Sequence, residues 1–430
     1  KAIFMMDASK GFKKDGPKNR LREQDLHKIV DTFLRQDESD PRYARLVPVS
    51  EIADPKNDYN LNLPRYIDST EPEDLQDIDA HLRGGIPDRD LDALAPYWKV
   101  MPGVRSALFQ PLRAGYSQLT TPNSQLKETI FAHPEFTAFT AQARQLFTRW
   151  QTATVPLLKA FTKNGLPKQL IETIAEDLLT TFRPAPLLDA YDVYQHLMDY
   201  WAETLQDDCY LIAADGWAAR TYRLLETDKK GRTRDKGWAC DLLPKRFIVA
   251  RYFAQEQAAI EARQAELEAT TAALAELEEE RGGEGDDQYL GALDKIAKAE
   301  VNARLKEIKG DKEAKEEAAV LQQWLKLSAD EAEHKKALRE AEAALDLLAY
   351  EKYPQLSEAE IQTLVVEDKW LATLSAAVRG ELDRVSQTLT SRIRQLAERY
   401  ATPLPQLTGD VAALAAKVDQ HLQKMGVVWK

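Results

Sequence analysis

The sequence has few cysteines, glycines and prolines, and it contains no long apolar run. Its 430 residues include two cysteines, 18 glycines and 20 prolines. Disulfide frameworks need more cysteines than this, so we expect Cys209 and Cys240 to be reduced thiols in a cytoplasmic protein. The low glycine and proline content argues against a loop-rich or disordered chain.

Membrane segments and metal sites are not predicted either. No stretch approaches the ~20 apolar residues that a membrane helix needs, and no charged leader followed by an apolar core opens the chain. The six histidines are scattered and do not pair with cysteine at metal-ligand spacing, so we expect no zinc site. Residue 1 is Lys rather than Met, which suggests a fragment or a processed product.

The charge distribution limits how the chain could contact nucleic acid. A formal net charge of −12 excludes a DNA grip over the whole surface, so any contact must be local or shared with a partner. One local excess has six positive side chains against one acid, Asp15: Lys10, Lys13, Lys14, Lys18, Arg20 and Arg22. These residues are candidates for contact with DNA phosphates or for an arm beside a cofactor cleft. The alternative is a solvated loop.

A second excess lies between residues 220 and 251, with ten positive residues against four negative ones. Trp217 and Trp238 flank it, and interleaved aromatic and basic residues can bind nucleic acid. The DNA-contact candidates here are Lys229, Lys230, Arg232 and Arg234. The alternative is a solvated turn whose tryptophans belong to the local core.

The residue pattern predicts a mainly α fold in four parts. Residues 1–110 should contain a strand at 2–6, a helix at 20–36 capped by Asn19, strands at 43–49 and 59–67, and a helix from 70–73. This is too little sheet for an independent α/β core, so we expect the rest of the sheet upstream of residue 1. Residues 111–252 should be helical from about Thr121-Pro122, with a surface β-hairpin near 221–243.

The other two parts are helical. Residues 253–353 have apolar residues at heptad spacing, including Ile260, Leu267 and Leu274, and predict a helical hairpin or antiparallel coiled coil. A polar break at 281–287 separates its arms, and Gly310 and a capping box at 328–331 suggest that the return arm is interrupted.

Residues 354–430 should hold C-terminal helices that dock a partner. A capping box at 357–360 predicts a helix over 361–400, which Pro403 and Pro405 stop, and a last helix over about 410–425. The long helix has one apolar stripe, which we take as the partner-docking candidate: Leu382, Val385, Leu389, Ile393, Leu396 and Tyr400. Such a stripe can pack on its own chain or on another protein.

Three blocks resemble the modification (M) subunits of type I restriction–modification systems, which are N6-adenine DNA methyltransferases. The blocks are Met6-Asp7-Ala8-Ser9 through Asn19-Arg20-Leu21-Arg22-Glu23-Gln24-Asp25; Asn57-Asp58-Tyr59-Asn60-Leu61-Asn62-Leu63-Pro64-Arg65-Tyr66-Ile67; and Asp368-Lys369-Trp370-Leu371 with Arg392-Ile393-Arg394-Gln395-Leu396, Arg399-Tyr400 and Met425-Gly426. The resemblance implies that residues 1–110 are the carboxy-terminal end of a methyltransferase domain that binds S-adenosylmethionine (AdoMet). It also implies four partners: a specificity subunit that packs on the C-terminal helices, a second M subunit, a motor-nuclease restriction subunit, and DNA.

The sequence departs from this family in its chemical motifs. The family binds AdoMet with a glycine-rich turn after a strand and holds the flipped adenine with an Asn-Pro-Pro-aromatic tetrad. No Asn-Pro-Pro occurs here, and Gly282-Gly283 lies in the polar break. We therefore assign no catalytic, cofactor-binding or metal residue, place AdoMet in the parent protein only, and expect this chain alone to be inactive.

Three other interpretations stay open. A coiled-coil scaffold protein would self-associate through residues 253–350. An adenine methylase fragment from another phage-defence system would use different partners. An enzyme active in its own right would bind AdoMet.

Overall fold

The computed structural model describes residues 1–70, 75–227, 231, 233–283, 288–291, 293, 295–311 and 313–425. The fold is mainly α with small sheets, as predicted. The chain forms two compact units: unit 1 contains residues 1–214 and 370–430, and unit 2 contains residues 215–369. No helix within the described ranges has both the length and the apolar character needed to cross a bilayer.

Unit 1 begins with a small two-stranded sheet. Strand β1 (Ala2–Met6) pairs antiparallel with β4 (Ala44–Pro48), and helix α1 (Glu23–Arg35) lies between them in the chain. Met5, Val47 and Ile67 are buried in the core of this segment. The predicted strands at 2–6 and 43–49 are therefore confirmed.

Two local predictions in this segment are wrong. Residues 59–67 form no strand, because Asp58 and Tyr59 adopt positive φ angles of 46° and 57° and turn the chain into a 3₁₀ turn, η1 (Leu63–Arg65). A short helix, α2 (Val49–Ile52), precedes this turn. Asn19 does not cap α1, because Asn19 lies in a strand and the N-cap residue is Arg22.

The next part of unit 1 contains a sheet that the sequence did not predict. Strands β5 (Ile86–Pro87), β6 (Phe109–Arg113) and β7 (Tyr116–Leu119) form an antiparallel sheet in the order β5-β7-β6. The helices around it are α3 (Ile78–Arg83), α4 (Asp88–Asp92), α5 (Ala95–Val100) and α6 (Pro102–Leu108). The helix start predicted at 70–73 lies mostly outside the described residues; α3 begins later, and Asp77 is its N-cap.

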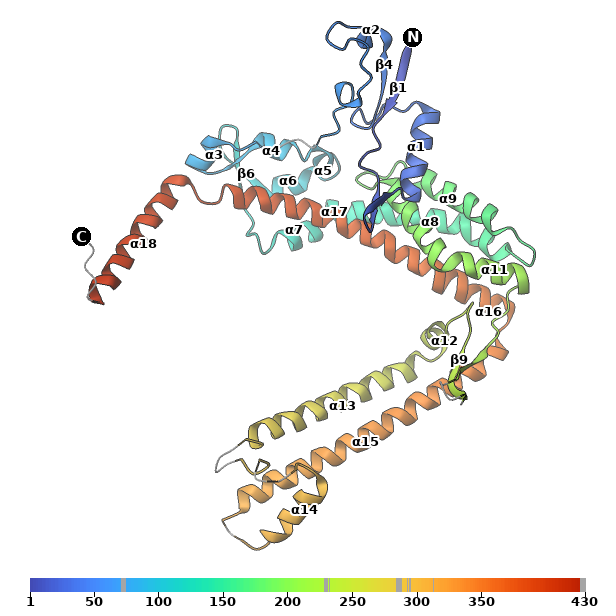
Figure 1. Cartoon of the computed structure of the whole chain (residues 1–430), viewed down its shortest axis with the longest axis vertical. Coiled ribbons are helices and arrows are strands. Elements are labelled where there is room, and N and C mark those ends of the chain that lie inside the picture. The colour runs from blue at the N-terminus through green and yellow to red at the C-terminus, as the bar shows by residue number, and fades with distance from the viewer. Residues whose placement is uncertain are drawn as a thin grey trace. The chain divides into compact units, whose positions relative to one another are not determined.

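The helical body of unit 1 combines segments from both ends of the chain. It consists of α7 (Leu126–Ala132), α8 (Pro134–Ala160), α9 (Pro167–Phe182), α10 (Ala190–Tyr200), the π-helical turn η2 (Trp201–Leu205), α11 (Gln206–Asp215) and α17 (Ala372–Arg399). Phe136, Phe139, Phe147 and Trp150 recur on one buried face of α8. Helix α17 packs against α7, α8 and α10 (Figure 1). The last helix, α18 (Leu404–Lys424), follows Pro403, so the prolines start this helix as well as ending the previous one.

Unit 2 is a long helical hairpin with a β-hairpin at its base. Strands β8 (Tyr222–Thr227) and β9 (Thr233–Ala239) pair as predicted. The helices are α12 (Lys245–Tyr252), α13 (Ala254–Arg281), α14 (Lys298–Glu307), α15 (Lys315–Lys352), the turn η3 (Tyr353–Gln355), α16 (Glu358–Gln362) and the π-helical η4 (Thr363–Leu371), which runs on into unit 1. The Ser357–Glu360 capping box is present at the start of α16.

The two arms of the hairpin are α13 and α15, which lie side by side (Figure 1). At their tip, Leu290, Val301 and Leu321 are fully buried in a separate core. Gly310 separates α14 from α15 as predicted, but the capping box at 328–331 lies inside α15 and starts no helix. Residues 284–287 of the polar break lie outside the described part of the chain.

Candidate nucleic-acid interface and docking surfaces

The first cluster of basic residues forms an exposed β-hairpin. Strand β2 (Lys13–Asp15) pairs with β3 (Lys18–Arg20), and Gly16 closes the turn with a φ of 60°. Both strands are exposed, and Arg20 pairs with Asp15 at 3.0 Å. Lys13, Lys14 and Lys18 make no ion pair with any residue that the structure describes. Their ammonium groups are therefore available to an anionic polymer.

The other two residues of this cluster lie at the base of the hairpin, beside an open cavity of about 790 Å³. Lys10 donates to the backbone carbonyl of Ser69. Both guanidinium contacts of Arg22 with the Asp25 carboxylate measure 2.9 Å. The hydrogen bond with Asp25 raises the pKa of Arg22. Burial alone would raise the pKa of Asp25. The hydrogen bonds from Arg22 outweigh burial, so the pKa of Asp25 is lowered. Arg22 is thus held within the chain rather than presented to DNA.

The cavity is polar and balanced in charge. Its charged lining residues are five cations and five carboxylates: Lys10, Arg22, Lys28, Arg42 and Arg392, with Asp7, Asp25, Asp40, Asp189 and Asp192. Asp7 accepts a 2.6 Å bond from the Ser69 hydroxyl and a 3.0 Å bond from the Ser9 amide, and these bonds lower its pKa. With as many acidic as basic side chains in its wall, the cavity has no clear preference for an anion. The cavity lies between the N-terminal segment and helices α10 and α17 of the helical body.

The second basic cluster forms the β8–β9 hairpin, whose strands are exposed along most of their length. Arg234 lies on β9, while Lys229, Lys230 and Arg232 lie outside the described residues. Two cations of this hairpin face acids on the opposite strand: Lys236 is 2.9 Å from Glu226, and Arg223 is 3.7 Å from Asp235.

The tryptophans beside this hairpin belong to the local core. Trp217 is buried, and the Trp238 ring packs edge-on against Tyr350 and Tyr353 at centroid distances of 5.3 and 5.2 Å. The Trp238 indole nitrogen donates a 2.9 Å bond to Asp346. Neither ring is free to stack on a base, so we interpret both tryptophans as part of the local core rather than as contacts with DNA.

The apolar stripe that the sequence suggested for partner docking is covered by the chain itself. Its members are 0–5% exposed: Leu382, Val385, Leu389, Ile393, Leu396 and Tyr400. They face α7, α8 and α10, which are distant in the sequence. Because these residues are buried, the stripe offers no free surface to another protein.

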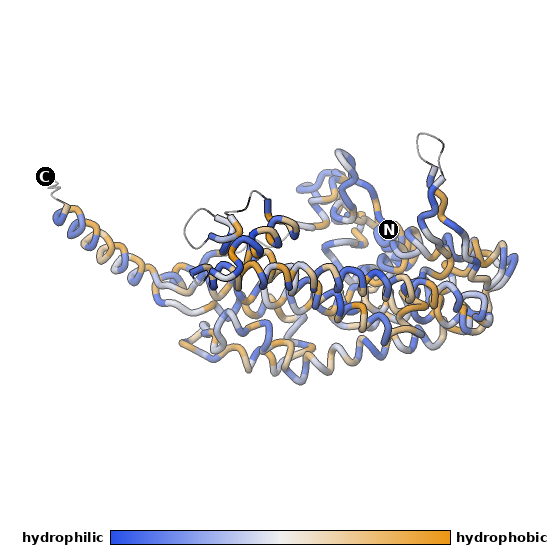
Figure 2. Tube along the Cα trace, turned by 90° about the horizontal axis from the view of Figure 1, so that it is seen from below, coloured by the Kyte–Doolittle hydropathy of each residue, from blue (hydrophilic) through white to orange (hydrophobic). Residues whose placement is uncertain are grey.

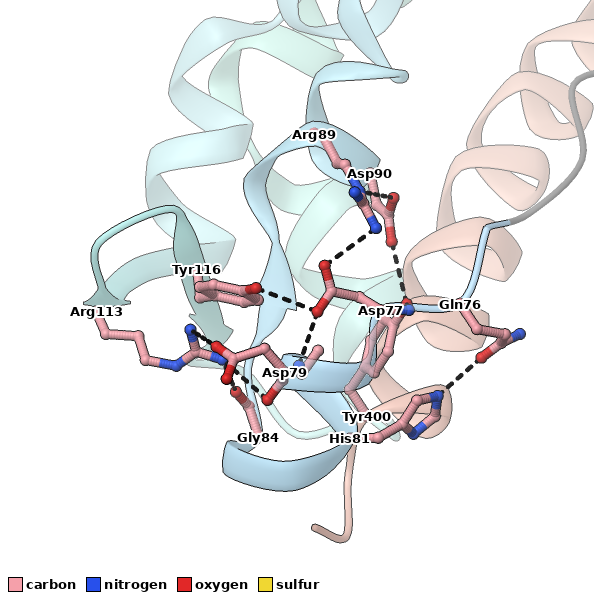
Figure 3. A network of polar contacts seen from close by, with 11 residues as sticks. Gln76, Asp77, Asp79, His81, Gly84, Arg89, Asp90, Arg113, Tyr116 and Tyr400 are labelled. Atoms are coloured by element: carbon pink, nitrogen blue, oxygen red, sulfur yellow. Dashed lines mark hydrogen bonds and ion pairs between the residues drawn. The ribbon is translucent and has the colours of Figure 1, made fainter. Parts of the chain in front are cut away.

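Tyr400, the last of these residues, takes part in a polar network at the end of α17 (Figure 3). The backbone amide of Asp77 donates to the Tyr400 hydroxyl at 3.3 Å, and this hydroxyl donates to Asp90 at 3.4 Å. The Asp77 carboxylate accepts from the Ala80 amide at 2.9 Å and also binds Arg89 at 3.0 Å. Bonds of this kind, led by the one from the Ala80 amide, lower the pKa of Asp77. The network attaches the end of α17 to α3 and α4.

Helix α18 carries an apolar stripe that is exposed, and our sequence analysis did not single it out. Leu404, Leu407, Val411, Leu414 and Val418 are 46–65% exposed and recur at intervals of three and four residues. Figure 2 shows these apolar positions along the helix that leads to the C-terminus. The spacing is visible in the sequence, but only the structure shows that no described part of the chain covers it.

Helix α1 is exposed on its apolar side as well. Leu26, Val30 and Phe33 are 44–59% exposed, while the polar Gln24 and Thr32 are buried. Gln24 donates a 2.9 Å bond to Asp192 of α10, which shows that α1 attaches to the helical body through its polar side.

One family model is similar to the beginning of the chain. Residues 1–75 match the family model described as N-6 DNA methylase. This match supports an N6 DNA methyltransferase family for the segment that contains β1, the β2–β3 hairpin, α1 and β4. No curated protein matches the chain, and no solved structure does.

The described residues do not fit the methyl donor of such enzymes. A doubly wound sheet binds its cofactor at a glycine-rich turn that follows a parallel strand. Here β1 pairs antiparallel with β4 and leads directly into Asp7, whose carboxylate is engaged by Ser9 and Ser69. In the described ranges no group of histidine, cysteine or acidic side chains is arranged to hold a metal ion.

Proposed function

We propose that the chain is the carboxy-terminal portion of the modification subunit of a type I restriction–modification system. It holds DNA and joins the subunits, while AdoMet and the target adenine are bound by other parts of the parent methyltransferase. The observation that carries the proposal is the N-6 DNA methylase match over residues 1–75, the segment that presents the β2–β3 hairpin. The helical architecture that follows supports it. The enzyme acts in the cytoplasm, where the DNA is.

The DNA contact in this proposal is made by Lys13, Lys14 and Lys18. They are exposed on a hairpin that carries four cations against one acid, Asp15, in a chain of net charge −12. Such contacts bind the phosphate backbone and carry no sequence information. Sequence choice belongs to the specificity subunit, which the resemblance places as a partner beside a second modification subunit and the motor-nuclease subunit.

The test compares two double charge reversals in the assembled modification enzyme. K13E/K14E should weaken duplex DNA binding, and it should reduce the slope of log affinity against log salt by roughly two, because each lost phosphate contact removes about 0.9. The matched control is K335E/K336E, which reverses two adjacent exposed lysines of α15. Equal effects of both variants would indicate net charge alone, and an unchanged slope for K13E/K14E would refute the contact.

The subunit role is tested separately by sedimentation of the chain with its cognate specificity subunit. A stable complex supports the type I assignment. If no complex forms and the chain instead self-associates through residues 253–350, it is a scaffold. If the chain binds AdoMet in calorimetry, the division of labour proposed above is wrong.

A further inference from the structure

We infer that α18 pairs antiparallel with α18 of a second copy of this chain. The inference goes beyond the proposed function and does not depend on it, because it rests on the surface of α18 alone. Each copy of the helix would cover the exposed apolar stripe of the other.

The stripe has the spacing of a two-stranded coiled coil. With Leu404 as the first core position, the core residues are Leu404, Leu407, Val411, Leu414, Val418, His421 and Met425, about three heptads. Every residue from 404 to 421 is exposed, so the face is open along the helix. The opposite side carries Gln406, Asp419, Gln420 and Gln423 with Gly409 and alanines between them, and it has no large apolar residue. A helix of this amphipathic kind must bury its apolar side against another element.

Charge complementarity selects the orientation. In an antiparallel pair, Val411 of one helix lies opposite Leu414 of the other, and Leu407 lies opposite Val418. This register brings Asp410 of each copy close to Lys417 of the other, so two pairs of opposite charge lie on one side of the seam, related by its two-fold axis. In a parallel pair, Asp410 would face Ala415, Lys417 would face Leu422, and His421 would face its own copy in the core. The antiparallel pair is therefore self-complementary in charge, and the parallel one is not.

The Tyr400 network holds in place the segment from which α18 begins. Because Asp77 and Asp90 bind the Tyr400 hydroxyl, the end of α17 is attached to α3 and α4 immediately before α18 begins. Helix α18 also contacts α3. An antiparallel two-fold pair is a closed arrangement, so it yields dimers rather than chains of molecules.

The first test is cysteine cross-linking of the full chain under mild oxidation. The native cysteines are buried, which keeps the background low. A mixture of L407C chains and V418C chains should cross-link, whereas L407C alone should not, since its two copies would be separated by about 16 Å along the axis. Cross-linking of L407C with itself would show a parallel pair and overturn the proposal.

The second test is a charge exchange read by sedimentation at roughly 10–100 μM, because a seam of about three heptads associates weakly. K417D and D410K should each weaken dimerisation about tenfold, and D410K/K417D should restore it. Equal dissociation constants for all four proteins would refute the pairing.

A third variant distinguishes pairing of two α18 helices from binding of a different protein to the stripe. V411D should abolish the dimer while leaving the helical content of the full chain unchanged, since Val411 is 65% exposed. A wild-type chain that stays monomeric, but binds the specificity subunit in a manner that V411D abolishes, would assign the stripe to that subunit and overturn the inference. That result would leave the proposed function intact.

Discussion

The indole nitrogen of Trp370 donates a 2.7 Å hydrogen bond to the carboxylate of Asp208, and both side chains are at most 3% exposed. Asp208 lies on α11, and Trp370 lies in η4, directly before α17. The bond therefore ties the start of the returning helix to a helix more than 160 residues earlier in the chain. A hydrogen bond to a buried charged acceptor is stronger than one to a neutral acceptor.

Replacing Trp370 should test whether the Asp208 carboxyl group binds it as a charged acceptor. W370F should lower the free energy of unfolding by about 2 kcal/mol beyond the loss of ring volume, measured by urea denaturation of the full chain. The matched control is W150F, whose buried indole donates a 3.0 Å bond to the neutral carbonyl of Ile174. Its hydrogen-bond loss should be about 1 kcal/mol. Equal losses for the two variants would contradict a special role of Asp208.

The His196–Glu381 pair should make stability depend on pH. The two side chains are 2.8 Å apart; the hydrogen bond with Glu381 raises the pKa of His196 above 6.5, and the bond with His196 lowers the pKa of Glu381 below 4.5. The raised histidine pKa stabilises the fold below about pH 6.5, and this contribution is lost as pH rises through the folded value. The lowered glutamate pKa stabilises the fold above about pH 4.5, and this contribution is lost on further acidification.

The pair thus contributes most between about pH 4.5 and 6.5. H196Q should lose up to about 1 kcal/mol there, an amount kept small by solvent screening of a side chain that is 35% exposed. Its deficit against the wild-type chain should shrink towards pH 8. The charges of Asp192, Asp199 and Arg384 also influence the pKa values of this pair, and these residues are the same in H196Q and in the wild-type chain. Chemical denaturation of H196Q and of the wild-type chain at a series of pH values measures this deficit.

The buried stripe of α17 should respond to mutation as a core. L389D and I393D each place a charge at a site with 0% exposure, so each should unfold unit 1 or lower its stability by several kcal/mol. V411D on α18 introduces the same charge on an exposed apolar position and should leave the thermal transition unchanged at concentrations below those at which α18 pairs. Normal folding of L389D, with loss of partner binding only, would restore the docking role suggested by the sequence.

Helices were predictable from the sequence where an apolar period continues over several turns. Phe136, Phe139 and Phe147 mark the buried face of α8, and Ile260 and Leu277 mark that of α13, because a helix must bury such a face. The β5-β7-β6 sheet escaped prediction because its strands are short and two of them contain proline, Pro87 and Pro111. The segment 59–67 alternates like a strand, but the two left-handed residues at its start, Asp58 and Tyr59, turn the chain.

The candidate site was predictable only in part. The Lys10–Arg22 cluster is visible as a run of charge, but its division into an exposed hairpin and a cavity wall depends on contacts of Lys10 and Arg22 with Ser69 and Asp25. The stripe of α17 and the stripe of α18 have the same spacing. Only tertiary contacts with α7, α8 and α10 decide which one is covered, and those helices are more than 170 residues away.

The discontinuity of unit 1 has a consequence for synthesis on the ribosome. Unit 2 is one continuous stretch, residues 215–369, whereas unit 1 lacks α17 until the chain has been made past residue 399. The inserted unit can therefore complete its folding first. The apolar faces of α7, α8 and α10 remain exposed until α17 covers them. During that interval the nascent chain is prone to aggregation, so a pause in translation shortly before residue 372 should lower the yield of native protein more than a pause after residue 400.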